Sequence, residues 1–143
     1  MPKSAVIDTS VLVSAFLFRE SVPGRVIELA EQNVYTLYLS PILIEEVTRS
    51  LHHPRLKEAY GYSDADVRVW CHTLKTIGTV WKKALPEIGS VCRDPDDDHV
   101  IACAHGVGAS WIVTGDHDLL ELEEYKGVRI VSARTFLEEM AVL

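Results

Sequence analysis

The amino-acid sequence predicts an α/β domain with a mostly parallel central sheet flanked by helices. Short apolar runs alternate along the chain with longer segments of helical character, a pattern typical of parallel sheets. The chain has 143 residues, of which 48% are hydrophobic and 24% charged, so it can bury a core without disulfides or a structural metal. It contains no internal repeat, low-complexity stretch or linker, and we therefore expect residues 1–143 to form a single domain.

The first half of the chain is expected to begin with a strand, followed by helices and a second strand. Residues 5–7 form an apolar run typical of a buried strand, and Thr9 or Ser10 is suited to cap a helix over residues 11–17. Residues 35–39 are aromatic and apolar, which favours a second strand. Two more helices, each with proline in its first turn, are expected from Pro23 to about residue 31 and from Ser40-Pro41 to about residue 53.

The second half repeats this alternation. Ser63 or Asp64 is expected to begin a helix that runs to about residue 77, and a short strand over residues 79–81 precedes a loop. Asp94-Pro95 is suited to begin a helix that ends at the glycines 106 and 108. The remaining expected elements are a strand over residues 111–114, a strand over residues 128–131 and a closing helix capped by Ser132.

The negative charge is concentrated in one segment. The formal net charge is −7, from 14 Lys and Arg against 21 Asp and Glu, yet residues 94–124 alone carry nine acidic side chains and no Lys or Arg. The rest of the chain is nearly neutral. Because concentrated carboxylates repel each other, they need full solvation or a cation. The net charge therefore does not exclude a nucleic-acid partner, and its location suggests a cation site.

Several acidic side chains are expected near the carboxyl ends of the strands, where ligands bind in open parallel sheets. Asp8 follows the first strand, Asp116 follows the strand over residues 111–114, and residues 94–98 begin the helix before that strand. A further acidic pair, Glu45-Glu46, lies in the helix after the second strand. Taken one at a time, these residues have simpler explanations, since Asp8 can cap a helix and Glu45-Glu46 can face solvent. Together they offer the carboxylate oxygens that Mg²⁺ or Mn²⁺ prefers.

Other features narrow the class of protein. The six histidines show no zinc-like spacing, and three cysteines without metal-like spacing suggest reduced thiols and a cytoplasmic protein. The longest apolar run is much shorter than the roughly 20 residues of a membrane span, and no signal peptide is expected. No aromatic platform for reading bases is evident, because Trp70, Trp81 and Trp111 lie on apolar faces and are expected in the core.

Four stretches resemble, in order, the motifs of PIN domains, the nuclease fold of VapC-type toxins. The resemblance extends from Ala5 to about Val131 and is nearest to the toxin components of toxin–antitoxin pairs. The four stretches are residues 5–12 (AVIDTSVL), residues 40–47 (SPILIEEV) followed by His53-Pro54, residues 94–104 (DPDDDHVIACA) and residues 109–120 (ASWIVTGDHDLL).

The resemblance implies a ribonuclease in which metal-activated water hydrolyses RNA phosphodiesters. It implies that Asp8, Glu46, Asp116 and either Asp97 or Asp98 line a Mg²⁺ or Mn²⁺ site, with Asp8 and Asp116 as primary ligands. Glu46 is preferred to Glu45 because the family's Glu directly precedes an apolar residue, whereas Asp97 and Asp98 both remain candidates. The resemblance also implies supporting roles near the metal for Thr9, Ser10, Thr114 and Asp118.

Basic side chains must hold the RNA, because the acidic site repels phosphate until a metal is bound. The candidates are Arg19, Arg25, Arg49, Arg55 and Lys57, with His52 and His53 nearby. The resemblance further implies three partners: an RNA substrate, a cognate antitoxin protein and a second copy of the chain in a homodimer.

Three other interpretations remain open. A degenerate PIN domain would bind RNA or protein without cleaving, although all four acidic positions are filled. A haloacid dehalogenase-like phosphatase also has Asp after its first strand, but its second Asp would fall at Ser10, and residues 94–124 lack the Lys it requires. A phosphoacceptor receiver domain would likewise need a Lys that is absent.

Overall fold

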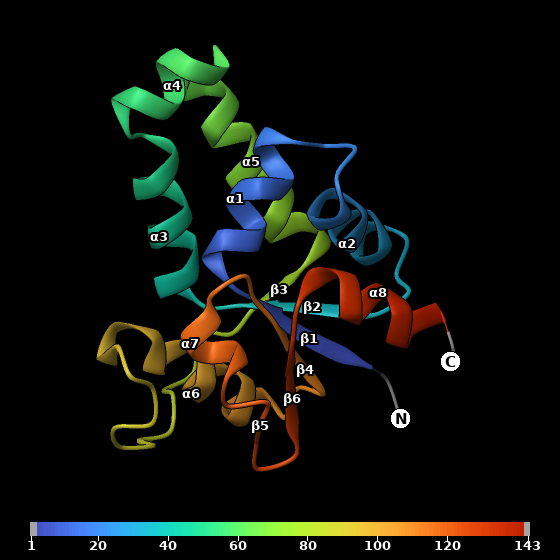
Figure 1. Cartoon of the computed structure of the whole chain (residues 1–143). Helices are drawn as coiled ribbons and strands as arrows, with labels where there is room; N and C mark the ends of the chain where they lie inside the picture. The colour runs from blue at the N-terminus through green and yellow to red at the C-terminus, as the bar shows by residue number, and fades with distance from the viewer. Residues whose placement is uncertain (1–2, 142–143) are drawn as a thin grey trace.

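Six strands form one central sheet in the computed structural model, which describes residues 3–141 (Figure 1). The strands are β1 (Ser4–Ile7), β2 (Thr36–Leu39), β3 (Thr79–Val80), β4 (Trp111–Val113), β5 (Glu124–Tyr125) and β6 (Val128–Val131). Their order across the sheet is β3-β2-β1-β4-β6-β5. All neighbouring pairs are parallel except the β5–β6 hairpin at one edge. The predicted α/β fold with a mostly parallel sheet is confirmed.

Helices cover both faces of the sheet (Figure 1). One face is covered mainly by α1 (Thr9–Leu17), α2 (Val22–Glu31), α3 (Pro41–Leu51), α5 (Asp64–Ile77) and α8 (Ala133–Ala141), and the other by α6 (Asp98–Val107) and α7 (His117–Leu120). The side chains of β1 alternate between these faces: Ala5 and Ile7 join the first core and Val6 the second. Since β1 is buried on both faces, its sequence is apolar throughout.

The helix starts differ from the sequence prediction in two places. Asp8, and not Thr9 or Ser10, is the N-cap of α1: its backbone is extended and its carboxylate accepts the Thr9 N–H. Asp94-Pro95 does not begin the long helix, because these residues form only a 3₁₀ turn, η1 (Pro95–Asp97), after which α6 starts. The expected end of this helix is confirmed, since Gly108 takes the left-handed conformation that glycine tolerates, with φ 71°.

Three short elements were not predicted: α4 (Pro54–Tyr60), α7 and β5. Helix α4 has no buried residue, so it shows no apolar periodicity that would reveal it. Its boundaries are nevertheless marked in the sequence, because Pro54 occupies its first turn and Gly61 ends it with φ 68°.

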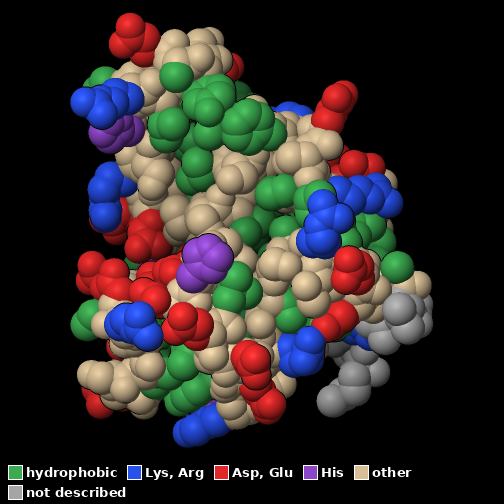
Figure 2. Space-filling view, viewed as in Figure 1, with side chains coloured by type: hydrophobic (Ala, Val, Ile, Leu, Met, Phe, Trp, Pro, Cys, Tyr) green, Lys and Arg blue, Asp and Glu red, His purple; other side chains and the backbone are tan. Residues whose placement is uncertain are grey.

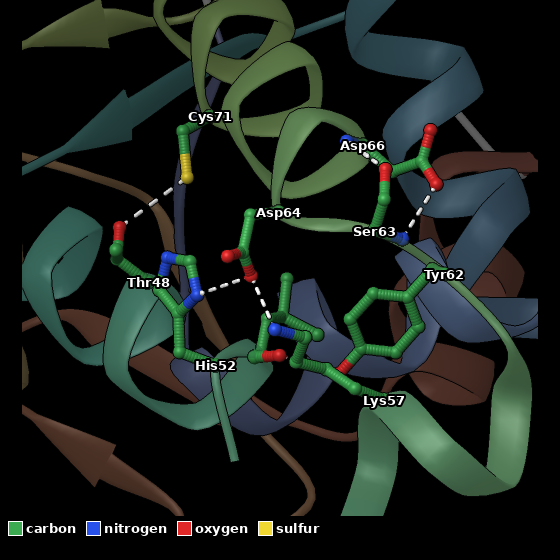
Figure 3. Close-up of polar contacts among 9 residues, drawn as sticks. Thr48, His52, Lys57, Tyr62, Ser63, Asp64, Asp66 and Cys71 are labelled. Carbon is green, nitrogen blue, oxygen red and sulfur yellow. Dashed lines mark hydrogen bonds and ion pairs between the residues drawn. The ribbon is translucent and has the colours of Figure 1, made fainter. Parts of the chain in front are cut away.

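A set of polar contacts joins the ends of α3, α4 and α5 (Figure 3). The Asp64 carboxylate contacts both the Lys57 ammonium and His52 Nδ1, the latter at 3.1 Å. The Tyr62 hydroxyl donates to the Leu51 carbonyl at 2.6 Å. Helix α4, which has little core contact of its own, is thus attached to its neighbours through polar side chains.

The core contains the tryptophans to different degrees. Trp70 and Trp111 are buried, as expected, whereas Trp81 is only half-buried. The three cysteines are free and buried. No helix between residues 3 and 141 combines the length and the apolar character needed to cross a membrane.

Candidate active site

Asp8 occupies the carboxyl end of β1, directly beside the end of β4. Its N–H donates to the Val113 carbonyl at 2.9 Å, which extends the parallel pairing of the two strands by one residue. The carboxylate is buried; its two oxygens accept the Thr9 N–H at 2.8 Å and the Thr114 hydroxyl at 2.7 Å. Burial raises the pKa of Asp8, while the two hydrogen bonds oppose that rise.

Thr114 connects Asp8 to Asp116. The Thr114 hydroxyl donates to Asp8 and accepts the Asp116 N–H at 3.0 Å, and the Asp116 carboxylate caps α7 by accepting the Asp118 N–H at 2.9 Å. The neighbouring Gly115 N–H donates to Ser10 Oγ at 3.2 Å. A single buried hydroxyl therefore fixes the positions of two acidic residues that are far apart in sequence.

Asp97 joins this group through Asp116. Burial, a hydrogen bond with the Asp116 side chain and the charges of Asp116, Asp8 and Asp94 together raise the pKa of Asp97 to about 7. Two carboxyl groups form such a bond only when one of them holds a proton. Asp97 therefore lies where the surrounding negative charge favours a positive ion.

Asp98 faces different groups. One of its carboxylate oxygens accepts the Cys92 N–H at 2.7 Å and the Val91 N–H at 3.3 Å, and these backbone bonds lower its pKa. Asp98 thus attaches the loop before η1 to the start of α6. Of the two candidates that the sequence could not separate, Asp97 is the one whose pKa is raised by the Asp116 side chain.

The adjacent residues Glu46 and Glu45 have different surroundings. Glu46 Oε1 accepts the Thr9 hydroxyl at 2.8 Å and lies 3.1 Å from His99 Nε2. Glu45 points to solvent and pairs with Arg49 on the next turn of α3. His99 was not singled out in the sequence analysis, although its place directly after the acidic run was a signal. Its other ring nitrogen is buried and contacts no described hydrogen-bond partner.

The donor set suits a hard cation, since the group is built from carboxylates held by hydroxyl and backbone N–H donors. Between residues 3 and 141, no three His, Cys, Asp or Glu side chains are already arranged as a metal cage. Burial is the main cause of the raised pKa of Asp97, and the negative charges of Asp116, Asp8 and Asp94 add to it, so a cation bound among these carboxylates would reduce their mutual repulsion. Figure 2 shows acidic side chains gathered over the α6 and α7 side of the molecule.

The basic side chains predicted to hold RNA lie outside this group, and most of them have partners of their own. The Arg19 guanidinium lies 4.5 Å from the centre of the Trp70 ring. Arg55 forms no ion pair within the described residues. Asp118, which was predicted to lie beside the metal, forms an ion pair with Arg93 at 3.6 Å. The other candidates form ion pairs: Arg25 with Glu28, Arg49 with Glu45 and Lys57 with Asp64.

Comparison with known proteins identifies the family. A family model described as PIN domain matches residues 4–118, which include all the acidic residues discussed above. The chain is also 30% identical to an uncharacterized protein of Methanocaldococcus jannaschii over 120 residues, which cover 83% of this chain and 74% of the relative. PIN domains are generally nucleases and usually need divalent metals. The chain belongs to the PIN domain family.

Proposed function

We propose that the protein is a Mg²⁺- or Mn²⁺-dependent endoribonuclease. The observation that supports it most strongly is the carboxyl pair Asp97–Asp116, connected to Asp8 through the Thr114 hydroxyl. After burial, the negative charges of Asp116, Asp8 and Asp94 contribute to the raised pKa of Asp97, and the same charges would attract a cation. A divalent ion would relieve this repulsion more fully than a single proton does.

Asp8, Asp97 and Asp116 would hold the ion, with Glu46 completing the site. The bound ion would lower the pKa of a water molecule and neutralise charge on the phosphodiester. The chain's own residues then have distinct tasks: Thr114 orients Asp8 and Asp116, while Thr9 and His99 orient Glu46. Glu46 or Asp97 would accept the proton of the attacking water. Asp98 would instead have a structural role, because it holds the loop before η1 through the Val91 and Cys92 N–H groups.

Membership of the PIN family argues against the haloacid dehalogenase and receiver-domain readings. A degenerate PIN domain that binds RNA or protein without cleavage is distinguished by experiment. The purified chain is incubated with single-stranded RNA and Mg²⁺, Mn²⁺ or EDTA. We expect cleavage with either metal, none with EDTA, and loss of at least about 100-fold in Asp8→Asn and Asp116→Asn.

Asp64→Asn is the matched control, because it removes the same charge at the α4–α5 corner. Binding of RNA without any metal-dependent cleavage would support the degenerate domain. Cleavage that survives in Asp8→Asn and Asp116→Asn would show that the proposed site is wrong.

The proposal includes a cytoplasmic toxin that is held inactive by an antitoxin protein and forms a homodimer. Exposed apolar side chains support a protein partner: Phe18 after α1 and Tyr60 at the end of α4, whose rings pack edge to face, and Val69 on α5. Figure 2 shows hydrophobic side chains gathered at the α4–α5 end of the molecule. Induced expression should arrest growth, Asp116→Asn should abolish the arrest, and co-expression of a neighbouring antitoxin reading frame should relieve it. Sedimentation of the purified chain tests the dimer.

A further inference from the structure

An open groove of about 450 Å³ lies next to the candidate active site. Its walls come from α1, the start of α2, the loop after β4 and the start of α8, which are distant in sequence. The lining residues that matter for its chemistry are Ser10, Ser14, Thr114, Gly115, Ser132 and Arg134.

The groove adjoins the carboxylate group through the residues that follow β4. Thr114, whose hydroxyl bonds Asp8, forms part of its wall, and so does Gly115, whose N–H donates to Ser10 Oγ. Because Ser10 Oγ accepts that bond, its own O–H remains available as a donor. Asp8 and Asp116 do not line the groove, but both are hydrogen-bonded to Thr114 in its wall, so a chain that leaves the groove at this end would lead toward them.

The charge along the groove differs from that on the other side of the site. Arg134 is exposed, and no described residue forms an ion pair or side-chain hydrogen bond with it. Among residues 3–141, no Asp or Glu lines the groove. On the α6–α7 side, by contrast, Arg93 is paired with Asp118 and Glu121 within the acidic segment. A polyanion that enters the site meets less repulsion along the Arg134 groove.

We propose that this groove holds the single-stranded RNA that flanks the scissile phosphate, with the Arg134 guanidinium binding a backbone phosphate. This inference rests on the proposed ribonuclease function and adds the path of the substrate. The Ser10 and Ser14 hydroxyls would donate to phosphate or 2′-hydroxyl oxygens, whereas the Ser132 hydroxyl already donates to Thr135 Oγ1. Val11, Val22 and Pro23 supply an apolar floor for the sugars, without an aromatic ring to select bases.

The test compares Arg134→Ala with Arg68→Ala. Arg68 is a matched control, since it is also exposed, lies on helix α5, and forms no ion pair with any described residue. Affinity for a short fluorescein-labelled single-stranded RNA of mixed sequence is measured in the Asp116→Asn background at several salt concentrations. The kcat and KM are then measured in the otherwise unaltered chain with Mn²⁺.

We expect Arg134→Ala to weaken binding by about threefold to tenfold and to reduce the log–log salt slope by about 0.7, the value for one lost contact to a single strand. KM should rise while kcat stays constant, because a contact remote from the reacting atoms stabilises ground and transition states alike. Arg134→Lys should restore most of the affinity, and Arg68→Ala should match the unaltered chain.

Two results would overturn the inference while leaving the ribonuclease proposal intact. The first is RNA binding with an unchanged salt slope in Arg134→Ala, as expected if the groove instead takes a protein segment. The second is an equal loss in Arg68→Ala, which would indicate a general effect of net charge. If the unaltered chain neither binds nor cleaves RNA with Mg²⁺ or Mn²⁺, the proposed function fails and this inference fails with it.

Discussion

Two clusters of charged side chains in this protein shift the pKa of an aspartate in opposite directions. Asp97 lies in η1, near Asp116 after β4, and burial together with neighbouring carboxylates raises its pKa to about 7. At the α4–α5 corner, the Lys57 ammonium, followed by His52, lowers the pKa of Asp64 (Figure 3). The carboxylate at the α4–α5 corner is thus paired with basic side chains of the chain, whereas the carboxylates around Asp97 face one another.

The difference separates structural carboxylates from candidate functional ones. Asp98, held by two backbone N–H groups, and Glu45, paired with Arg49, belong with Asp64 because the chain supplies their partners. Asp97 instead faces other carboxylates, since the charges of Asp116, Asp8 and Asp94 add to the effect of burial in raising its pKa. Four predictions test this division, in order of decreasing expected effect.

The largest effect is expected from the adjacent pair on α3. Glu46→Gln should lower kcat for RNA cleavage by about 10- to 100-fold, because it removes the charge that Thr9 and His99 orient toward the site. Glu45→Gln, one residue away and exposed, should change kcat less than about twofold. Steady-state cleavage with Mn²⁺ checks both variants, and equal losses would remove the distinction between them.

Metal should stabilise the chain, and more so at high pH. Since the folded pKa of Asp97 lies above its ordinary value of 3.8, the folded state binds the extra proton between those values. The metal-free chain should therefore lose stability as pH rises through about 7. Mg²⁺ at about 100 times its Kd should add about 2.7 kcal/mol, or roughly 5–10 °C in Tm.

Thermal unfolding with Mg²⁺ or EDTA, at about pH 5.5 and about pH 8, checks the sign of this effect. The Mg²⁺ shift should be larger at the higher pH, and Asp97→Asn should be more stable than the unaltered chain when both are metal-free there. A Mg²⁺ shift that is greater at the lower pH would contradict the raised pKa of Asp97.

Asp98→Ala should act on stability through the loop that Asp98 holds. Loss of the acceptor for the Cys92 and Val91 N–H groups should lower the free energy of unfolding by about 1–2 kcal/mol. Urea denaturation measures this loss, and Mn²⁺ affinity of the folded variant should remain near that of the unaltered chain. A large loss of metal affinity without destabilisation would place Asp98, and not Asp97, in the site.

The smallest effect is expected at the α4–α5 corner. Asp64→Asn removes a partner of Lys57 and His52 in an exposed cluster, where such pairs contribute little. Because the pKa of Asp64 is lowered, its contribution is present above pH 3.8 and is lost as pH falls through the folded pKa. Tm near neutral pH should change by less than about 2 °C, and RNA cleavage should not change.

Residues at the ends of strands could be placed from the sequence, but the directions in which adjacent side chains point could not. Asp8 and Asp116 were expected beside each other because parallel strands bring their carboxyl ends to one edge, and the structure has them there. The choice between Asp97 and Asp98 was not accessible, since both lie where η1 passes into α6 and adjacent side chains point in different directions.

Other misses have equally local causes. His99 contacts Glu46 from a separate helix, a pairing that no spacing along the chain reveals. Arg134, proposed above to bind phosphate, lies beyond the acidic segment of residues 94–124 and comes near the site because β6 pairs with β4 and returns the chain there. Helix α4 was missed because it has no buried face, so its sequence shows no apolar periodicity.

Binding of Mn²⁺ tests the central claim most directly, namely that the unbalanced carboxylates form a cation site. Free Mn²⁺ is measured by electron paramagnetic resonance during titration at about pH 8, where Asp97 is mostly ionised. The unaltered chain and Asp64→Asn should bind with the same affinity, while Asp97→Asn and Asp116→Asn should bind at least about tenfold more weakly. Equal affinity in all four proteins, or no binding by the unaltered chain, would contradict the account.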